Sequence, residues 1–221
     1  MAVSVLFPTT GRPDRAEACL RQLRETAPDV EIIAAVDADP DTAVRIAPLV
    51  DKLLVCPDYR GCSKAWNDCL AEATGDPIVF AADDLVWGEG WLEAALAKLE
   101  EFEDGWGLVG FNDGHWDAEL STHYLMSRRF IVEVLGGVVA WSWYPHSFND
   151  AEVNQRSRQA GRYAWAEDSH VRHEHWTFGD RPQDETDTRT LGEHGQANEV
   201  YLARLAAGFP NDGVTPIITE Y

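Results

Sequence analysis

The sequence predicts an α/β protein built on a mostly parallel sheet with helices on both faces. Short apolar runs typical of strands alternate with stretches in which apolar residues recur at helical spacing. These strand runs are almost continuously apolar, which is typical of parallel strands covered on both sides. Polar residues follow several of them, and in such sheets ligands bind beyond the carboxyl ends of the strands.

The first half of the chain carries the regular alternation. Pro13 suits the first turn of a helix that runs to Ala27, and Gly75 stands where a helix C-terminal cap belongs. Strands are expected at 3–7, 31–36, 52–56, 78–82 and 107–111, and further helices at 42–47, 61–73 and 91–99.

The second half is less regular. We expect short elements at 124–127 and 130–135, a helix at 150–160, strands at 163–166 and 170–175, and a final helix at 199–207. The stretch 176–196 is polar and rich in Asp, Thr and Gly, which predicts a mobile loop.

Composition narrows the class of protein. The 221 residues are 45% apolar and 25% charged, which is ordinary for a globular protein. The net charge of −20 disfavours nonspecific binding to nucleic acid or acidic membranes. The sequence shows no apolar run of membrane-spanning length and no signal peptide at its start, so we expect a cytoplasmic protein. The four cysteines form no Cys-x-x-Cys pair and are expected to be free thiols.

The adjacent carboxylates Asp83 and Asp84 end an apolar run and are the first candidates for a functional site. Such oxygen ligands suit Mg²⁺ or Mn²⁺ when phosphates supply the remaining ligands. The alternative is that they end the strand and cap the next helix. Thr9 and the pair Asp37 and Asp39 follow two other strands, so the three strand ends should converge on one crevice. That convergence favours a metal-bound diphosphate.

The order of these parts resembles the GT-A fold of nucleotide-sugar glycosyltransferases, particularly family 2, including phage and bacterial members. The resemblance is carried by four motifs: Pro8-Thr9-Thr10-x-Arg12-Pro13, Arg60-Gly61-x-x-x-Ala65-x-Asn67 before Asp83-Asp84, Gly136-Gly137 before Asn149-Asp150, and Val171-Arg172-His173-Glu174-His175. It implies a Rossmann-like sheet with an irregular, acceptor-side C-terminal region. A single domain over 1–221 would then have a nucleotide-sugar-binding half, 1–112, and an acceptor-side half, 113–221.

The resemblance also implies roles for the metal site. Asp84 is expected to bind the divalent ion, with Asp83 reaching the ribose, or the ion through water. His173 is the first choice for a further ligand and His175 the second. The alternative for both is a hydrogen-bonded imidazole. The sequence has Ala-Asp-Asp where the family has Asp-x-Asp, so which carboxylate holds the metal stays open.

At the nucleotide end, Thr9 and Asp37 or Asp39 are expected to recognise base and ribose. Helix capping and turn formation are the alternative roles for these residue types. Arg12 and Lys64 are cations that could approach the diphosphate, although a solvated side chain is the simpler interpretation of Lys64.

On the acceptor side, Asp150 is the candidate general base for an inverting displacement. It could equally be an acid in the first turn of a helix. Glu167 and Asp168 are the competing acidic pair. Trp141, Trp143 and Trp176 flank the expected site, and their rings could stack on a sugar or base.

We therefore expect a metal-dependent, inverting hexosyl- or pentosyltransferase with a UDP-linked donor. A nucleotidyltransferase is the enzymatic alternative, but it should carry a Gly-rich phosphate loop after the first strand. A non-catalytic nucleotide-sugar-binding module is the alternative outside catalysis. The acceptor stays open among glycans, small molecules, proteins and modified DNA bases such as hydroxymethylated bases of phage DNA.

Overall fold

The computed structural model describes residues 2–144, 146–211 and 213–221. At its centre lies one eight-stranded sheet with the order β3-β2-β1-β4-β7-β6-β8-β5. The strands are β1 (Ser4–Thr9), β2 (Glu31–Asp37), β3 (Lys52–Cys56), β4 (Ile78–Phe80), β5 (Leu85–Trp87), β6 (Leu108–Asn112), β7 (Tyr124–Met126) and β8 (Tyr163–His173). Strands β1 to β4 pair in parallel, as do β6 and β8, whereas β7 and β5 pair antiparallel with their neighbours.

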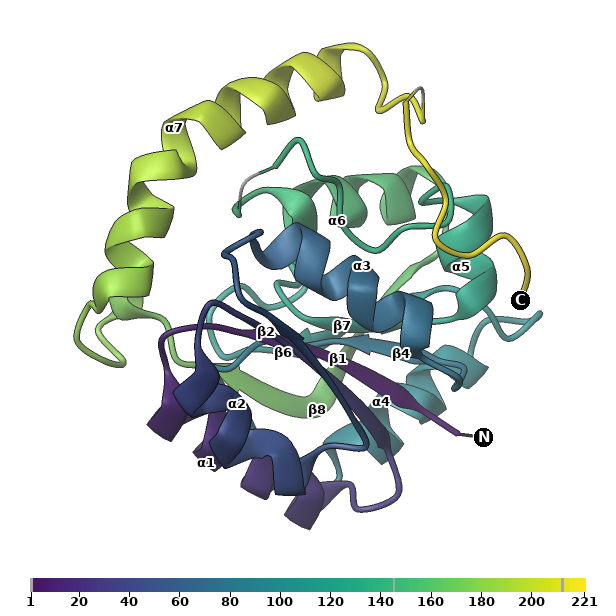
Figure 1. Ribbon diagram of the computed structural model, residues 1–221. Coiled ribbons are helices and arrows are strands. Elements are labelled where there is room, and N and C mark those ends of the chain that lie inside the picture. The colour runs from purple at the N-terminus through teal and green to yellow at the C-terminus, as the bar shows by residue number, and fades with distance from the viewer. Residues whose placement is uncertain (1, 145, 212) are drawn as a thin grey trace.

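Helices cover both faces of the sheet, which confirms the predicted fold class (Figure 1). The helices are α1 (Pro13–Thr26), α2 (Pro40–Ile46), α3 (Cys62–Glu72), α4 (Trp91–Glu100), α5 (Arg128–Glu133), α6 (Asn149–Gln159) and α7 (Glu185–Ala206). Helices α1, α2 and α4 pack on one face, and α3, α5 and α6 on the other. Alternate residues of β1 serve the two cores: Val5 and Phe7 face the first, and Leu6 faces the second.

The strand register brings the predicted strand ends together. Ser4 of β1 lies beside Glu31 of β2 on one side and beside Ile78 of β4 on the other. Because these strands are parallel, Thr9, Asp37 and the residues after Phe80 leave the sheet at the same edge.

Three features of the fold differ from the sequence predictions. The two strands expected at 163–166 and 170–175 form one strand, β8. The three-residue strand β5 follows the acidic pair directly and was not expected. The segment 176–196, expected as a loop, contains a 3-10 helix, Trp176–Phe178, and the first half of α7. Helix α7 begins earlier than predicted because Asp184 and Asp187 form a capping box, each carboxylate accepting the backbone N–H of the other.

Helix α7 arches over the side of the molecule that carries α3 and α6 (Figure 1). Of its 22 residues, Asp187 and Ala197 are the buried ones. Across the described ranges, no helix has the length and apolar character needed to cross a membrane.

Candidate active site

A cavity of about 660 Å³ opens at the carboxyl edge of the sheet. It brings together residues that are far apart in the chain. Those among the predicted site residues are Thr9, Arg12, Asp37, Asp83, Asp84, Asp150, His173, His175 and Trp176. The expected convergence of three strand ends is therefore present in the fold.

Asp83 joins the ends of β1 and β4. Its carboxylate accepts a hydrogen bond from Thr9 Oγ1 at 2.6 Å and from Arg12 Nη1 at 2.9 Å. Burial raises the pKa of Asp83 despite the nearby Arg12 guanidinium. The Thr9 contact shows directly that the two strand ends meet.

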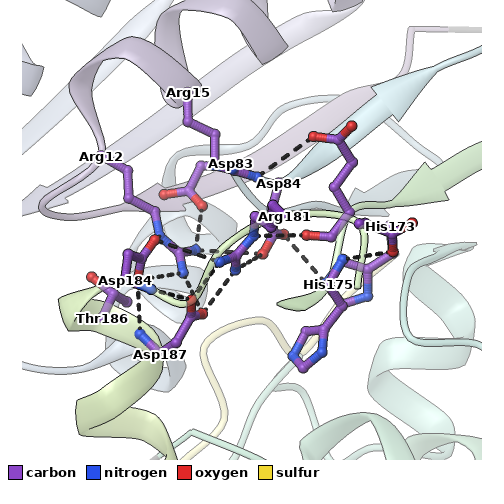
Figure 2. Close-up of polar contacts among 12 residues, drawn as sticks. Arg12, Arg15, Asp83, Asp84, His173, His175, Arg181, Asp184, Thr186 and Asp187 are labelled. Atoms are coloured by element: carbon purple, nitrogen blue, oxygen red, sulfur yellow. Dashed lines mark hydrogen bonds and ion pairs between the residues drawn. The ribbon is translucent and has the colours of Figure 1, made fainter. Parts of the chain in front are cut away.

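Asp84 is the carboxylate that faces the histidine pair (Figure 2). Its Oδ2 lies 3.4 Å from Arg12 Nη1 and 3.5 Å from Arg181 Nη2. Its Oδ1 lies 3.4 Å from His173 Nε2 and, although buried, has no hydrogen-bond partner among the described residues. A buried carboxylate oxygen without a donor is costly, and a cation bound beside it would satisfy it.

Electrostatics favour the charged form of Asp84. Burial opposes its charge, but His173 and Arg12 more than offset that penalty and hold the pKa of Asp84 well below its usual range. Burial likewise opposes a charge on His173, yet the facing Asp84 carboxylate leaves the pKa of His173 raised. His175, 5.1 Å from His173 between ring centroids, has its pKa lowered by burial.

Behind His173 lies a polar chain that the sequence did not predict. Thr122 Oγ1 donates to Asp113 Oδ2 at 2.9 Å and lies 3.5 Å from His173 Nδ1. Because its only proton goes to Asp113, the Thr122 oxygen can accept from the ring nitrogens Nδ1 of His123, 3.1 Å away, and of His173. A proton on Nδ1 of His173 would leave Nε2, which faces Asp84 Oδ1, free to bind a cation once it loses its own proton.

Arg12 connects the acidic pair to the start of α7 (Figure 2). Its Nε donates to Asp184 at 2.8 Å and its Nη2 to Asp187 at 2.7 Å. Arg181 also binds Asp187, and its Nε donates to the Glu174 carbonyl at 2.8 Å. The Arg12 guanidinium thus lines the cavity while engaged with four carboxylates, and its predicted contact with a diphosphate stays a prediction.

At the nucleotide end, Asp37 and Asp39 have different surroundings. Asp37 lines the cavity and accepts from the backbone N–H of Arg60 at 2.8 Å and from its guanidinium Nη2 at 2.8 Å. Asp39 does not line the cavity. It caps α2 by accepting from Thr42 N at 3.0 Å, and it also accepts from Gly11 N at 2.7 Å. Asp39 therefore shapes the loop after β1, and the capping alternative holds for it.

Three other predicted residues lie outside the cavity. Lys64 is exposed on α3 and pairs with Asp68 one turn later. Trp141 is buried in the core, and its backbone N–H donates to Asn149 Oδ1 at 2.8 Å. The Trp143 ring packs under the Arg204 guanidinium, 4.1 Å from its centroid. Of the three predicted tryptophans, Trp176 is the one that lines the cavity.

Asp150 stands in the first turn of α6, where Phe148 rather than Asp150 is the N-cap. Its Oδ1 accepts from Ala151 N at 2.9 Å, and it forms no ion pair within the described part of the chain. Burial raises the pKa of Asp150. Asp150 is thus a half-buried carboxylate at the cavity wall, and its role as general base stays a prediction.

Sequence reasoning missed several residues of the site. Arg181, Asp184 and Asp187 lie in the segment that was expected to be a loop. The spacing of two acidic residues before a helix was the signal that could have placed them. The Thr122 and His123 side chains also line the cavity. No sequence pattern predicted these two residues, because it is the short antiparallel strand β7 that brings them to the cavity.

The fold and the site define a class: an α/β protein that gathers carboxylates and histidines where parallel strands end, as nucleotide-binding sheets do. A family model described as glycosyl transferase family 2 matches residues 4–182. The chain belongs to glycosyl transferase family 2 and is a glycosyltransferase by class. No curated protein sequence matches it.

Solved structures share the fold at low sequence identity. Glucosyl-3-phosphoglycerate synthase from Mycobacterium tuberculosis, solved with Mn²⁺ and UDP, matches with a TM-score of 0.65 and 17% identity over 96% of this chain and 82% of its own. The mannosyltransferase PcManGT from Pyrobaculum calidifontis, solved with GDP-Man and Mn²⁺, matches with a TM-score of 0.63 and 16% identity. The match covers 97% of this chain and 76% of PcManGT. TarS from S. aureus matches with a TM-score of 0.63 and 14% identity. The match covers 77% of this chain but only 36% of TarS.

Proposed function

We propose that the chain transfers a sugar from a UDP-linked donor to an acceptor hydroxyl with inversion at the anomeric carbon. The observation that carries this proposal is the unpartnered Oδ1 of Asp84 facing His173 Nε2 at 3.4 Å inside the cavity. One structural relative is solved with UDP and Mn²⁺ and another with GDP-Man and Mn²⁺, which supports a metal-bound nucleotide-diphosphate donor; uridine is our proposal.

The residues present fit a divalent cation. Asp84 offers a charged carboxylate oxygen, and His173 offers a ring nitrogen oriented by Thr122. Within the described ranges no group of three or more His, Cys, Asp or Glu side chains forms a complete metal site. Two protein ligands suit Mn²⁺ or Mg²⁺ when diphosphate oxygens and water supply the rest. When bound, the ion would neutralise charge on the leaving diphosphate.

The nucleotide would lie at the β1–β2 side of the cavity. Asp37, fixed by Arg60, is placed to accept from a pyrimidine N–H. Thr9 and Asp83 stand between that position and Asp84, which supports a contact of Asp83 with the ribose. This order follows the strands across the sheet, from base to ribose to diphosphate.

The reaction requires a base for the acceptor. The acceptor oxygen attacks the anomeric carbon as the bond from that carbon to the diphosphate oxygen breaks, and the electron pair leaves with the diphosphate. Asp150 takes the proton of the acceptor hydroxyl. Burial supports this role, because a raised pKa strengthens the ionised carboxylate as a base.

A thermal-shift panel of nucleotide sugars, each with and without Mn²⁺, tests the proposal. A bound donor raises the melting temperature with its occupancy. We expect one UDP-sugar to stand out, and only when Mn²⁺ is present. Proton NMR of the product then gives the anomeric configuration. Equal shifts for every nucleotide sugar, or a product that keeps the donor configuration, would contradict the proposal.

A further inference from the structure

We propose that this cavity holds an acceptor subsite for an uncharged saccharide, formed by an aromatic platform of Trp116 and Phe178. The inference deepens the proposed transferase function. Only the assignment of the bound saccharide as the acceptor rests on that function. The platform itself stands on contacts of this chain that were not expected from the sequence.

The two rings are exposed but held in place. Trp116 is 40% exposed and Phe178 is 45% exposed, and both line the cavity. Phe178 stacks on His115 with ring centroids 3.9 Å apart and planes 10° apart, and it meets Trp116 edge-on at 5.7 Å. Because these exposed rings are already held in place, a ligand can pack on them with little loss of side-chain conformational entropy.

Polar contacts fix the supports of the platform. His115 Nε2 lies 2.9 Å from Asp180 Oδ2, which holds the imidazole under Phe178. The backbone N–H of Trp116 donates to the buried Asp113 carboxylate at 3.1 Å. Asp113 also accepts from Thr122 Oγ1, so the platform and the His173 site share one support.

The sheet order places the platform on the acceptor side. Trp116 follows β6, and Phe178 follows β8, whereas Thr9 and Asp37 follow β1 and β2. Strand β4, which precedes the acidic pair, lies between these two groups in the sheet. A donor that extends from Asp37 to Asp84 therefore presents its sugar toward the platform.

Charge argues against an anionic acceptor there. The two cationic residues that line the cavity, among those described, are Arg12 and Arg189. Arg12 is engaged by carboxylates, and Arg189 lies over the Tyr59 ring, at 4.0 Å, on the nucleotide side. Beside the platform, the His175 ring lies 6.1 Å from Phe178 between centroids, and the cavity wall also carries the Asp150 carboxylate. An uncharged sugar, with an apolar C–H face and hydroxyls, suits such a surface.

The binding test needs no transfer. Saturation-transfer NMR on the full chain is recorded with methyl β-glucoside, cellobiose and maltose, and with glucose 6-phosphate and glucuronate as anionic probes. We expect saturation to reach C–H protons of at least one neutral sugar and of neither anion. Trp116→Ala and Phe178→Ala should each weaken that binding about tenfold, while Trp116→Phe restores most of it. Tyr221→Ala removes an exposed ring remote from the cavity and is the matched control.

Results that reject the platform can be told apart from results that reject the proposed transferase function. Binding of the anions alone, or equal binding by Trp116→Ala and the unchanged chain, would overturn the platform. So would absence of any sugar signal, which would leave the rings to another occupant. Failure of the nucleotide-sugar panel would instead reject the transferase proposal, and neutral-sugar binding through Trp116 would then mark a saccharide-binding site without transfer.

Discussion

Replacing Asp150 by asparagine is expected to abolish turnover while leaving donor binding intact. Asparagine has nearly the same shape, and its Oδ1 can still accept from Ala151 N, the contact seen at 2.9 Å. It cannot take a proton from the acceptor hydroxyl. Loss of a general base typically costs a factor of ~10² to 10⁴ in rate, which corresponds to about 2.7 to 5.5 kcal/mol in the activation barrier.

The same substitution separates a catalytic carboxylate from a structural one through its effect on stability. Because burial raises the pKa of Asp150, the folded state disfavours the ionised form, and ionisation at neutral pH costs stability. Asp150→Asn removes that cost, so the free energy of unfolding at pH 7 should stay equal or increase. A carboxylate that stabilised the first turn of α6 would show the opposite sign.

The assay combines three measurements on the same preparation. Transfer is followed by release of nucleotide diphosphate, donor binding by thermal shift with Mn²⁺, and stability by urea denaturation. The unchanged chain should also lose kcat on acidification at a pH above the ordinary carboxyl value, because the base must be ionised. Full turnover in Asp150→Asn, or a clear loss of its stability, would refute the reasoning.

Three further predictions concern the acidic pair and its supports. Asp84→Asn should abolish the Mn²⁺-dependent stabilisation by the donor; retention of the metal effect would exclude Asp84 as a ligand. Thr122→Val should weaken the apparent Mn²⁺ affinity ~10-fold, as loss of a contact behind a metal-binding histidine does, whereas Thr122→Ser should stay near the original; equal affinities would show that Thr122 does not orient His173. Asp187→Asn should cost about 1 to 3 kcal/mol and speed proteolysis within 180–206, because its carboxylate holds α7 to Arg12 and Arg181. Although burial opposes the charge of Asp187, Arg181 lowers its pKa to about 2, so this contribution is present at neutral pH and lost as the pH falls from the ordinary 3.8 toward about 2.

The fold was predictable where local pattern and tertiary structure agree. The apolar runs of β1, β2 and β4 and the helical stripes of α1, α3 and α4 need no long-range information, because each is buried against the layer next to it. Strand β5 was not predictable. Three residues carry no period of their own, and Leu85–Trp87 is a strand only because β8 pairs with it.

The candidate site, like the fold, was predictable from the sequence only in part. Asp37, Asp83 and Asp84 could be predicted because Asp37 ends β2 and the acidic pair closely follows β4, and parallel strands end at one edge. Asp39 also follows a strand, yet a capping bond holds it outside the cavity, whereas Lys64 is the solvated side chain that the sequence favoured. Side-chain direction at the end of an element depends on the neighbouring segments.

The sequence alone determined the layered sheet, the family resemblance and the meeting of strand ends, since these follow from short-range periodicity and from the geometry of parallel strands. Only the tertiary structure decided which side chains contact the residues at those strand ends. Arg12 binds Asp187, 175 positions away, and Thr122 stands behind His173 across 51 positions. Contacts over such separations are set by how the layers pack, and packing leaves no local pattern from which to infer them.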